Sequence, residues 1–136
     1  MALSLNDALS HYHSVSDTAH KFWGYFQIVA AGTAAFAWSR EAGGELQLFA
    51  FLALGFAVFA ALNWRLVVCT QSEAVAAAHC VKAHASALGD AVPRELRPLV
   101  ERIDPDPAFL VGVWHAVLSC ATLGAVWWRY ATVADC

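Results

Sequence analysis

Three uncharged apolar runs, each long enough to cross a bilayer as a helix, constrain this chain more than any other feature. They cover Phe22–Trp38, Leu46–Trp64 and Ala108–Trp128, with 17, 19 and 21 residues. A bilayer core of roughly 30 Å requires about 20 apolar residues in a helix, with a range near 17–25. One such run could belong to the core of a soluble protein, but three in 136 residues leave too little polar chain to cover them. The sequence therefore predicts an integral membrane protein that has the lipid bilayer as its main partner.

Composition and the positions of the aromatic residues agree with this prediction. Apolar residues make up 60% of the chain and charged residues only 14%, whereas an ordinary soluble domain carries roughly 25% charge. The net charge of −3 excludes the basic surface that a nucleic-acid-binding protein needs. Tryptophan favours the headgroup level of a membrane, and most of the six tryptophans fall at the ends of the runs: Trp23, Trp38, Trp64, Trp127 and Trp128.

The basic residues near the ends of the runs predict the orientation. Cytoplasmic loops carry the excess of Lys and Arg. Six of the eight basic residues lie in the N-terminal segment or between the second and third runs: Lys21, Arg65, Lys82, Arg94, Arg97 and Arg102. The other side has only Arg40 and Arg129. We therefore expect a protein of the bacterial inner membrane, with a cytoplasmic N-terminus and the C-terminus outside.

The segments between the runs predict an all-α fold with cytoplasmic extensions. We expect one membrane domain over residues 1–136, with spans at about 22–38, 46–66 and 108–128 and a cytoplasmic helical region over 5–21 and 67–106. Asn6 or Asp7 can cap an N-terminal helix that continues into the first span. The second helix should run for some 40 residues and stop at Gly89, because no Pro and no other Gly outside the membrane interrupts it.

This projecting second helix needs a partner that buries Val75, Val81 and Leu88, and the N-terminal helix of the same or another subunit is the expected one.

A short amphipathic helix is predicted before the third span. Its apolar residues recur at helical spacing: Leu96, Leu99, Val100 and Ile103. Pro93 suits a first helical position, and Pro98 is expected to kink or shorten the element. Such a helix would lie at the membrane surface or on the projecting helices.

Small residues form stripes on the second and third spans. Helices in lipid associate through close contacts between small residues. The stripes are Ala50, Ala53, Ala57 and Ala60 in the second span, and Gly112, Ala116, Cys120 and Gly124 in the third. They suit packing within one three-helix bundle, but three spans offer few internal partners for these faces, so we expect a homo-oligomer.

Polar residues within the spans are the first candidates for a functional site, because polar groups in lipid are costly. By the 1.5 Å helical rise, His115 lies roughly 10 Å and Gln27 about 8 Å from the cytoplasmic boundary. These residues would line a polar cavity or pore in the inner half of the bilayer: Gln27, Asn63, Arg65, His115, Ser119 and Thr122. The alternative is an interhelical hydrogen bond that fixes packing, with Arg65 reaching to the headgroups.

Histidines outside the membrane form a second, weaker candidate. His13, Asp17 and His20 share one face of the N-terminal helix, while His79 and His84 lie on the projecting second helix. If the two helices meet, these side chains could bind Zn²⁺ or another divalent metal. The alternative is that they are ordinary surface histidines, because no paired Cys-x-x-Cys or similar metal-binding spacing is present.

Two functions remain open from the sequence. The first is a small oligomeric channel or pore-like assembly for ions or small solutes. The second is a non-conducting regulatory subunit that docks a membrane protein partner through its cytoplasmic helices. We expect no enzyme activity and no cofactor, because the chain has no phosphate-binding glycine loop and no hydrolase or metalloprotease motif.

Overall fold

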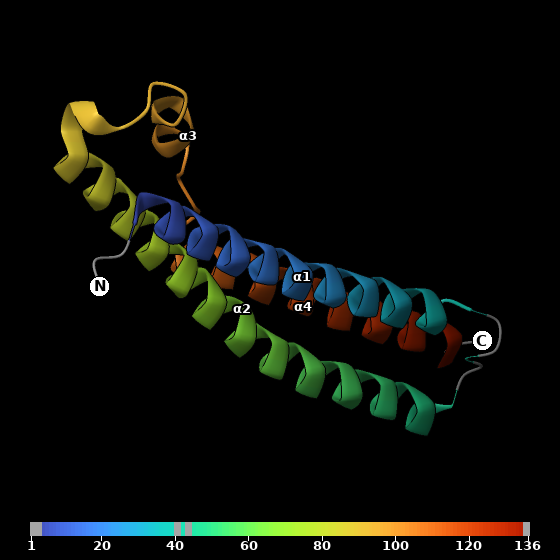
Figure 1. Ribbon diagram of the computed structural model, residues 1–136. Helices are drawn as coiled ribbons and strands as arrows, with labels where there is room; N and C mark the ends of the chain where they lie inside the picture. The colour runs from blue at the N-terminus through green and yellow to red at the C-terminus, as the bar shows by residue number, and fades with distance from the viewer. Residues whose placement is uncertain (1–3, 40–41, 43–44, 135–136) are drawn as a thin grey trace.

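The computed structural model describes residues 4–39, 42 and 45–134, and this part of the chain is helical without any strand. Three long helices lie side by side, and a short fourth one sits at one end of the assembly (Figure 1). The elements are α1 (Leu5–Ala37), α2 (Leu46–Leu88), the 3₁₀ turn η2 (Gly89–Ala91), α3 (Arg97–Glu101) and α4 (Ala108–Ala134). The predicted all-α fold is confirmed for these residues.

Helix α1 begins at a capping box and then runs without interruption through the first apolar run. The Ser4 side chain accepts a hydrogen bond from the Asp7 backbone N–H, and the Asp7 carboxylate accepts one from the Ser4 N–H. These bonds satisfy donors that the first helical turn leaves free. Asn6 or Asp7 was the expected cap. Ser4 takes that position instead, because Asp7 stands three residues further on, where its carboxylate can reach back.

Helix α2 ends where the sequence predicts. Its 43 residues correspond to about 65 Å, roughly twice the thickness of a bilayer core. Gly89 stops it with a φ of 52°, a left-handed conformation that a side chain disfavours. A helix of this length must project well beyond any bilayer that it crosses.

Helix α3 is shorter than predicted. The apolar spacing suggested a helix starting at Pro93, but a turn occupies the residues after Pro93 and the helix covers only Arg97–Glu101. Pro98 is the second residue of this helix, where its missing N–H costs nothing. Pro98 therefore helps to start the helix, and of the two expected effects, a kink or a shortening, the shorter helix is the one observed.

The end of the molecule that carries α3 has a packed apolar core of its own, which we call the tip cluster. It joins residues from α1, α2 and the segment around α3: Leu5, Ala8, Leu9, Ala78, Val81, Val92, Val100 and Ile103. The N-terminal half of α1 is thus the partner that covers the projecting part of α2, as expected. Val81 is fully buried and Val75 half-buried, but Leu88 at the end of α2 is exposed, which departs from the expectation.

Two further apolar clusters follow along the long helices. Phe26, Phe56 and Ala60 form the middle cluster, and Ala37, Ala42, Phe49 and Val126 form the one at the opposite end. Each joins α1 to at least one of the other two long helices. Helix α1 therefore lies along most of α2 and contacts α4, while the last turns of α2 extend past the start of α1 (Figure 1).

Two of the helices, α2 and α4, are long and apolar enough to cross a membrane. Only 22% of the most apolar window of each is buried within the protein, so their apolar side chains mostly face outward. A core helix of a soluble protein would be mostly covered. The first run, in α1, is less apolar than these two because it includes Gln27, Tyr25 and Thr33.

Candidate functional site

The polar groups between the long helices meet at one buried pair, His115 of α4 and Asn63 of α2. The His115 Nε2 lies 3.2 Å from the Asn63 Oδ1, and both residues are buried. A carbonyl oxygen can only accept, so Nε2 carries the proton and donates. The Asn63 Nδ2 in turn donates to the Phe22 carbonyl of α1 at 3.5 Å. These bonds link all three long helices at one level, and we call them the polar pin.

Aromatic rings close the pin against solvent. The Phe26 ring lies 3.9 Å from the His115 ring, centroid to centroid, at an interplanar angle of 32°, and the Trp23 ring lies 5.8 Å away. His115 is only 1% exposed. The pin is therefore a dry contact between helices, in which the polar groups satisfy one another.

Of the six residues predicted to line a cavity, the structure brings three together. Asn63, His115 and Ser119 are neighbours, although the Ser119 hydroxyl donates mainly to the His115 carbonyl at 2.8 Å. The Thr122 hydroxyl is buried and donates to the Leu118 carbonyl of its own helix.

The Gln27 and Arg65 side chains are exposed and are not part of the polar pin, but Arg65 lines a hollow between α2 and α4 together with His115 and Ser119. Sequence reasoning missed the aromatic partners Trp23 and Phe26. Their positions in the sequence could have indicated them, because both lie in α1 at a depth close to that of His115.

The small-residue stripes are only partly used within the chain. Gly112 and Ala60 are buried, Ala53 and Ala57 are half-buried, and the remaining four residues of the stripes are exposed: Ala50, Ala116, Cys120 and Gly124. Gly112 packs against α2, where the Trp64 Nε1 donates to its carbonyl at 3.2 Å.

The predicted histidine cluster stays dispersed. His13, His20, His79 and Asp17 are exposed and His84 is half-buried. The Asp17 carboxylate pairs with the Lys21 ammonium at 2.7 Å, which lowers the pKa of Asp17 and raises that of Lys21. The His20 Nδ1 lies 2.7 Å from the Ser16 carbonyl of its own helix. Within the described ranges, no three His, Cys, Asp or Glu side chains are grouped to hold a metal ion.

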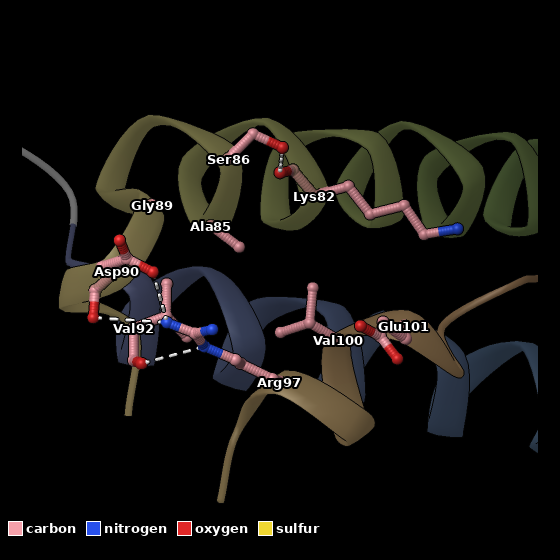
Figure 2. Close-up of a pocket in the computed structure, with 9 residues that line it drawn as sticks. All are labelled: Lys82, Ala85, Ser86, Gly89, Asp90, Val92, Arg97, Val100 and Glu101. Carbon is pink, nitrogen blue, oxygen red and sulfur yellow. Dashed lines mark hydrogen bonds and ion pairs between the residues drawn. The ribbon is translucent and has the colours of Figure 1, made fainter. Parts of the chain in front are cut away.

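The tip holds a cavity of about 620 Å³ that sequence reasoning did not anticipate (Figure 2). It lies between the last turns of α2, the η2 turn and α3, and is lined by Lys82, Ala85, Ser86, Gly89, Asp90, Val92, Arg97, Val100 and Glu101. We call it the tip pocket. Its wall combines the apolar side chains of Ala85, Val92 and Val100 with charged groups of both signs.

Arg97 forms part of the rim of the tip pocket, where hydrogen bonds hold its side chain. Its guanidinium donates to the Asp90 carboxylate at 3.2 Å, and further bonds reach the carbonyls of Asp90 and Val92 (Figure 2). These contacts tie α3 to the turn that ends α2. Lys82 on the opposite wall lies 3.9 Å from the Asp104 carboxylate. One side of the pocket therefore carries an arginine that is hydrogen-bonded to the turn after α2, and the other side carries a lysine in a longer ion pair.

No family model matches this chain, and neither a curated protein nor a solved structure matches it.

Proposed function

We propose that this protein is a non-conducting membrane subunit that docks a partner protein through the tip. The observation that carries the proposal is the different placement of two sets of polar groups, one between the long helices and one at the tip. Those between the long helices bond to one another in the dry polar pin, whereas a cavity of about 620 Å³ with charged walls lies at the tip. The helices thus act as an anchor, and the tip acts as the docking surface.

The membrane placement belongs to this proposal. Three spans in the inner membrane of a bacterium, with the N-terminus and the tip in the cytoplasm, fit the distribution of basic residues. The packing of α1 supports the third span: Phe26 packs with Phe56 of α2, and Ala37 packs with Val126 of α4. If α2 and α4 cross a bilayer, α1 lies at the same depth and crosses with them.

The tip pocket suits a protein partner that inserts an apolar side chain flanked by charges. Ala85, Val92 and Val100 provide an apolar wall, and the exposed Leu88 and Leu99 extend the apolar surface nearby. Arg97 is paired with Asp90, whereas Lys82 is held only by a 3.9 Å ion pair with Asp104, so Lys82 and Glu101 are the charged groups more readily available to the partner.

A photo-crosslinking experiment tests the docking role. A photoreactive residue at Leu99 should give one discrete adduct in native membranes, whereas the same residue at exposed Gln47, at the other end of α2, should not. Ala85→Trp fills the pocket and should abolish the adduct, and Ala83→Trp on an exposed face of the same turn should leave it. Adducts that are equal at both positions, or that survive Ala85→Trp, would contradict the proposal.

The channel stays a prediction. A conducting path would have to form between copies of the chain, because the polar pin is closed within one copy. The exposed small residues Ala116, Cys120 and Gly124 would then face the neighbouring copy. Purified protein in liposomes should show no ion flux above that of empty vesicles. A flux that His115→Ala alters would overturn the non-conducting role and favour the channel.

A further inference from the structure

A further hollow, separate from the tip pocket and bordered by His115 of the polar pin, runs along the seam between α2 and α4. Its largest part has a volume of about 530 Å³ and is lined mainly by small residues: Ala57, Ala60, Ala61, Ala116, Ser119 and Cys120. A smaller hollow of about 240 Å³ continues it along the same seam and shares Leu123 with it. We call the two together the α2–α4 groove.

The groove is mainly apolar because small residues line it at helical spacing. Ala57 and Ala61 follow each other at i and i+4 on α2, as do Ala116 and Cys120 on α4. Residues four apart share one helix face, so each wall is a row of short side chains. The long side chains that flank them, among them Trp64 and Leu123, leave a furrow in place of a flat face.

A positive charge stands at one end of this furrow. Arg65 continues the row of Ala57 and Ala61 by one more helical turn, and it also lines the groove. It is the first charged residue after the apolar run of α2. Among the residues that the structure describes, no carboxylate lies within ion-pair distance of it. Its charge is therefore available to an anion at the headgroup level.

We propose that the α2–α4 groove binds an anionic phospholipid. One acyl chain lies in the furrow between the small residues, and the headgroup phosphate pairs with the Arg65 guanidinium. Arginine favours phosphate because its planar donors can bind two oxygens at once. The inference rests on the proposed crossing of the membrane by α2 and α4, and it is independent of docking at the tip.

Charge decides between a lipid and a second copy of the chain in this groove. Two copies related by a twofold axis along the membrane normal would present their groove arginines at the same depth. The described parts of α2 and α4 that line the groove contain no Asp or Glu to offset this repulsion. A phosphate supplies the missing negative charge.

Native mass spectrometry of the purified protein in mild detergent tests the proposal with two added lipids, phosphatidylglycerol and phosphatidylcholine. The wild type should retain phosphatidylglycerol at least several-fold better, because phosphatidylcholine has a cationic group that offsets its phosphate. Arg65→Gln should abolish this preference, and Arg94→Gln, at an exposed arginine near the tip, should leave it unchanged. Equal retention of both lipids by the wild type would overturn the proposal.

A steric pair of variants tests the acyl-chain part. Ala61→Leu fills the furrow and should lower retention of both lipids, whereas Ala31→Leu, at an exposed alanine of α1, should not. Far-ultraviolet circular dichroism confirms that each variant is folded. Inorganic phosphate added alone should not displace the lipid; complete displacement would show a simple anion site and overturn the lipid assignment. A protein dimer that forms in place of lipid binding, and is lost in Ala61→Leu, would assign the groove to a second copy.

Discussion

At the scale of single residues, the polar pin shows how one hydrogen bond can fix the rotation of a helix. His115 can reach Asn63 at only one orientation of α4 about its axis, and Asn63 must at the same time reach the Phe22 carbonyl. Apolar packing in lipid has little directional preference, because neighbouring side chains and lipid tails are equally apolar. The pin therefore selects one arrangement of three helices.

Removing one partner of the pin should cost more than removing both. Asn63→Leu leaves the His115 Nε2 buried without an acceptor, and we expect a loss of about 1–2 kcal/mol in the free energy of unfolding. The double variant Asn63→Leu/His115→Phe should recover most of this loss, since a phenyl ring keeps the contact with Phe26. Titration with a denaturing detergent, followed by circular dichroism, measures both.

Ser119→Ala is the matched control, because its hydroxyl donates mainly to a carbonyl of its own helix. Ser119→Ala should lower the free energy of unfolding by less than Asn63→Leu does. Additive losses in the double variant would show that Asn63 and His115 do not interact.

The stability of the first turn of α1 depends on pH through the Asp7 carboxylate. The Ser4 hydroxyl, at 2.6 Å, and the Ser4 N–H, at 3.2 Å, both donate to the Asp7 carboxylate and lower its pKa below 3.8. A lowered pKa in the folded state means that the capping contribution is complete above the unfolded value and is lost as the pH falls through the folded value. We expect the first turn of α1 to fray only under such acidic conditions.

Backbone carbon chemical shifts of the first turn, followed by NMR against pH, measure this fraying. Ser4→Ala removes the hydroxyl donor, so the Asp7 pKa should move back toward its ordinary value. An Asp7 that titrates at 3.8 or above in the wild type would contradict the capping box.

At the scale of the elements, the sequence was most informative where a single residue type controls the backbone. Gly89 ends α2 as predicted, because a left-handed conformation suits glycine. The predicted start of α3 at Pro93 was wrong, because the apolar spacing from Leu96 to Ile103 fits both a turn and a helix. The actual start at Arg97 lets Pro98 occupy a position where no N–H is needed.

The candidate site could be predicted only in part, because depth along a helix is readable from sequence but rotation is not. Gln27 and His115 were expected at nearly the same depth. The structure turns His115 into the contact between helices and Gln27 to the outside. Which of two polar residues is buried depends on the packing of whole faces, and short-range spacing does not contain that information.

The contact between α2 and α4 predicts a difference between two glycines of the same stripe. A Cβ at Gly112 would lie 3.2 Å from both the Trp64 Nε1 and the Val68 Cγ2, whereas one at Gly124 would meet nothing within 4 Å. Alanine gains up to about 1 kcal/mol over glycine from helix propensity alone, and overpacking costs about 1–3 kcal/mol. Gly112→Ala should therefore be less stable than Gly124→Ala by about 1–3 kcal/mol in the same detergent titration, because the gain in helix propensity is common to both variants and cancels. Equal stabilities would mean that the helices separate at Gly112 without cost.

At the scale of the whole molecule, the three long helices combine a dry interior with an apolar exterior. The tip cluster adds a small apolar core at one end, so one end of the chain resembles a soluble helical hairpin and the rest resembles a membrane bundle. The boundary between these parts falls between the tip cluster and the polar pin. This division explains why α2 is about twice as long as a bilayer is thick.

The proposed placement in the membrane gives a labelling pattern for a thiol reagent that cannot cross membranes. In a background without native cysteines, Glu45→Cys should react in intact cells, because the segment between α1 and α2 faces outward. Ser10→Cys should react only after permeabilisation, because the first half of α1 lies in the cytoplasm. Both positions are exposed on the protein, so protein burial does not explain a difference between them.

The native cysteines supply the controls for this pattern. Cys80, restored alone, should behave like Ser10→Cys, since it is exposed on the projecting part of α2. Cys120 is also exposed on the protein, yet it should stay unreactive on either side because lipid covers α4 at that depth. Reaction of Ser10→Cys and Glu45→Cys from the same side would show that α1 does not cross. Ready labelling of Cys120 would instead place water around α4, and both the anchor role and the lipid groove would then fail together.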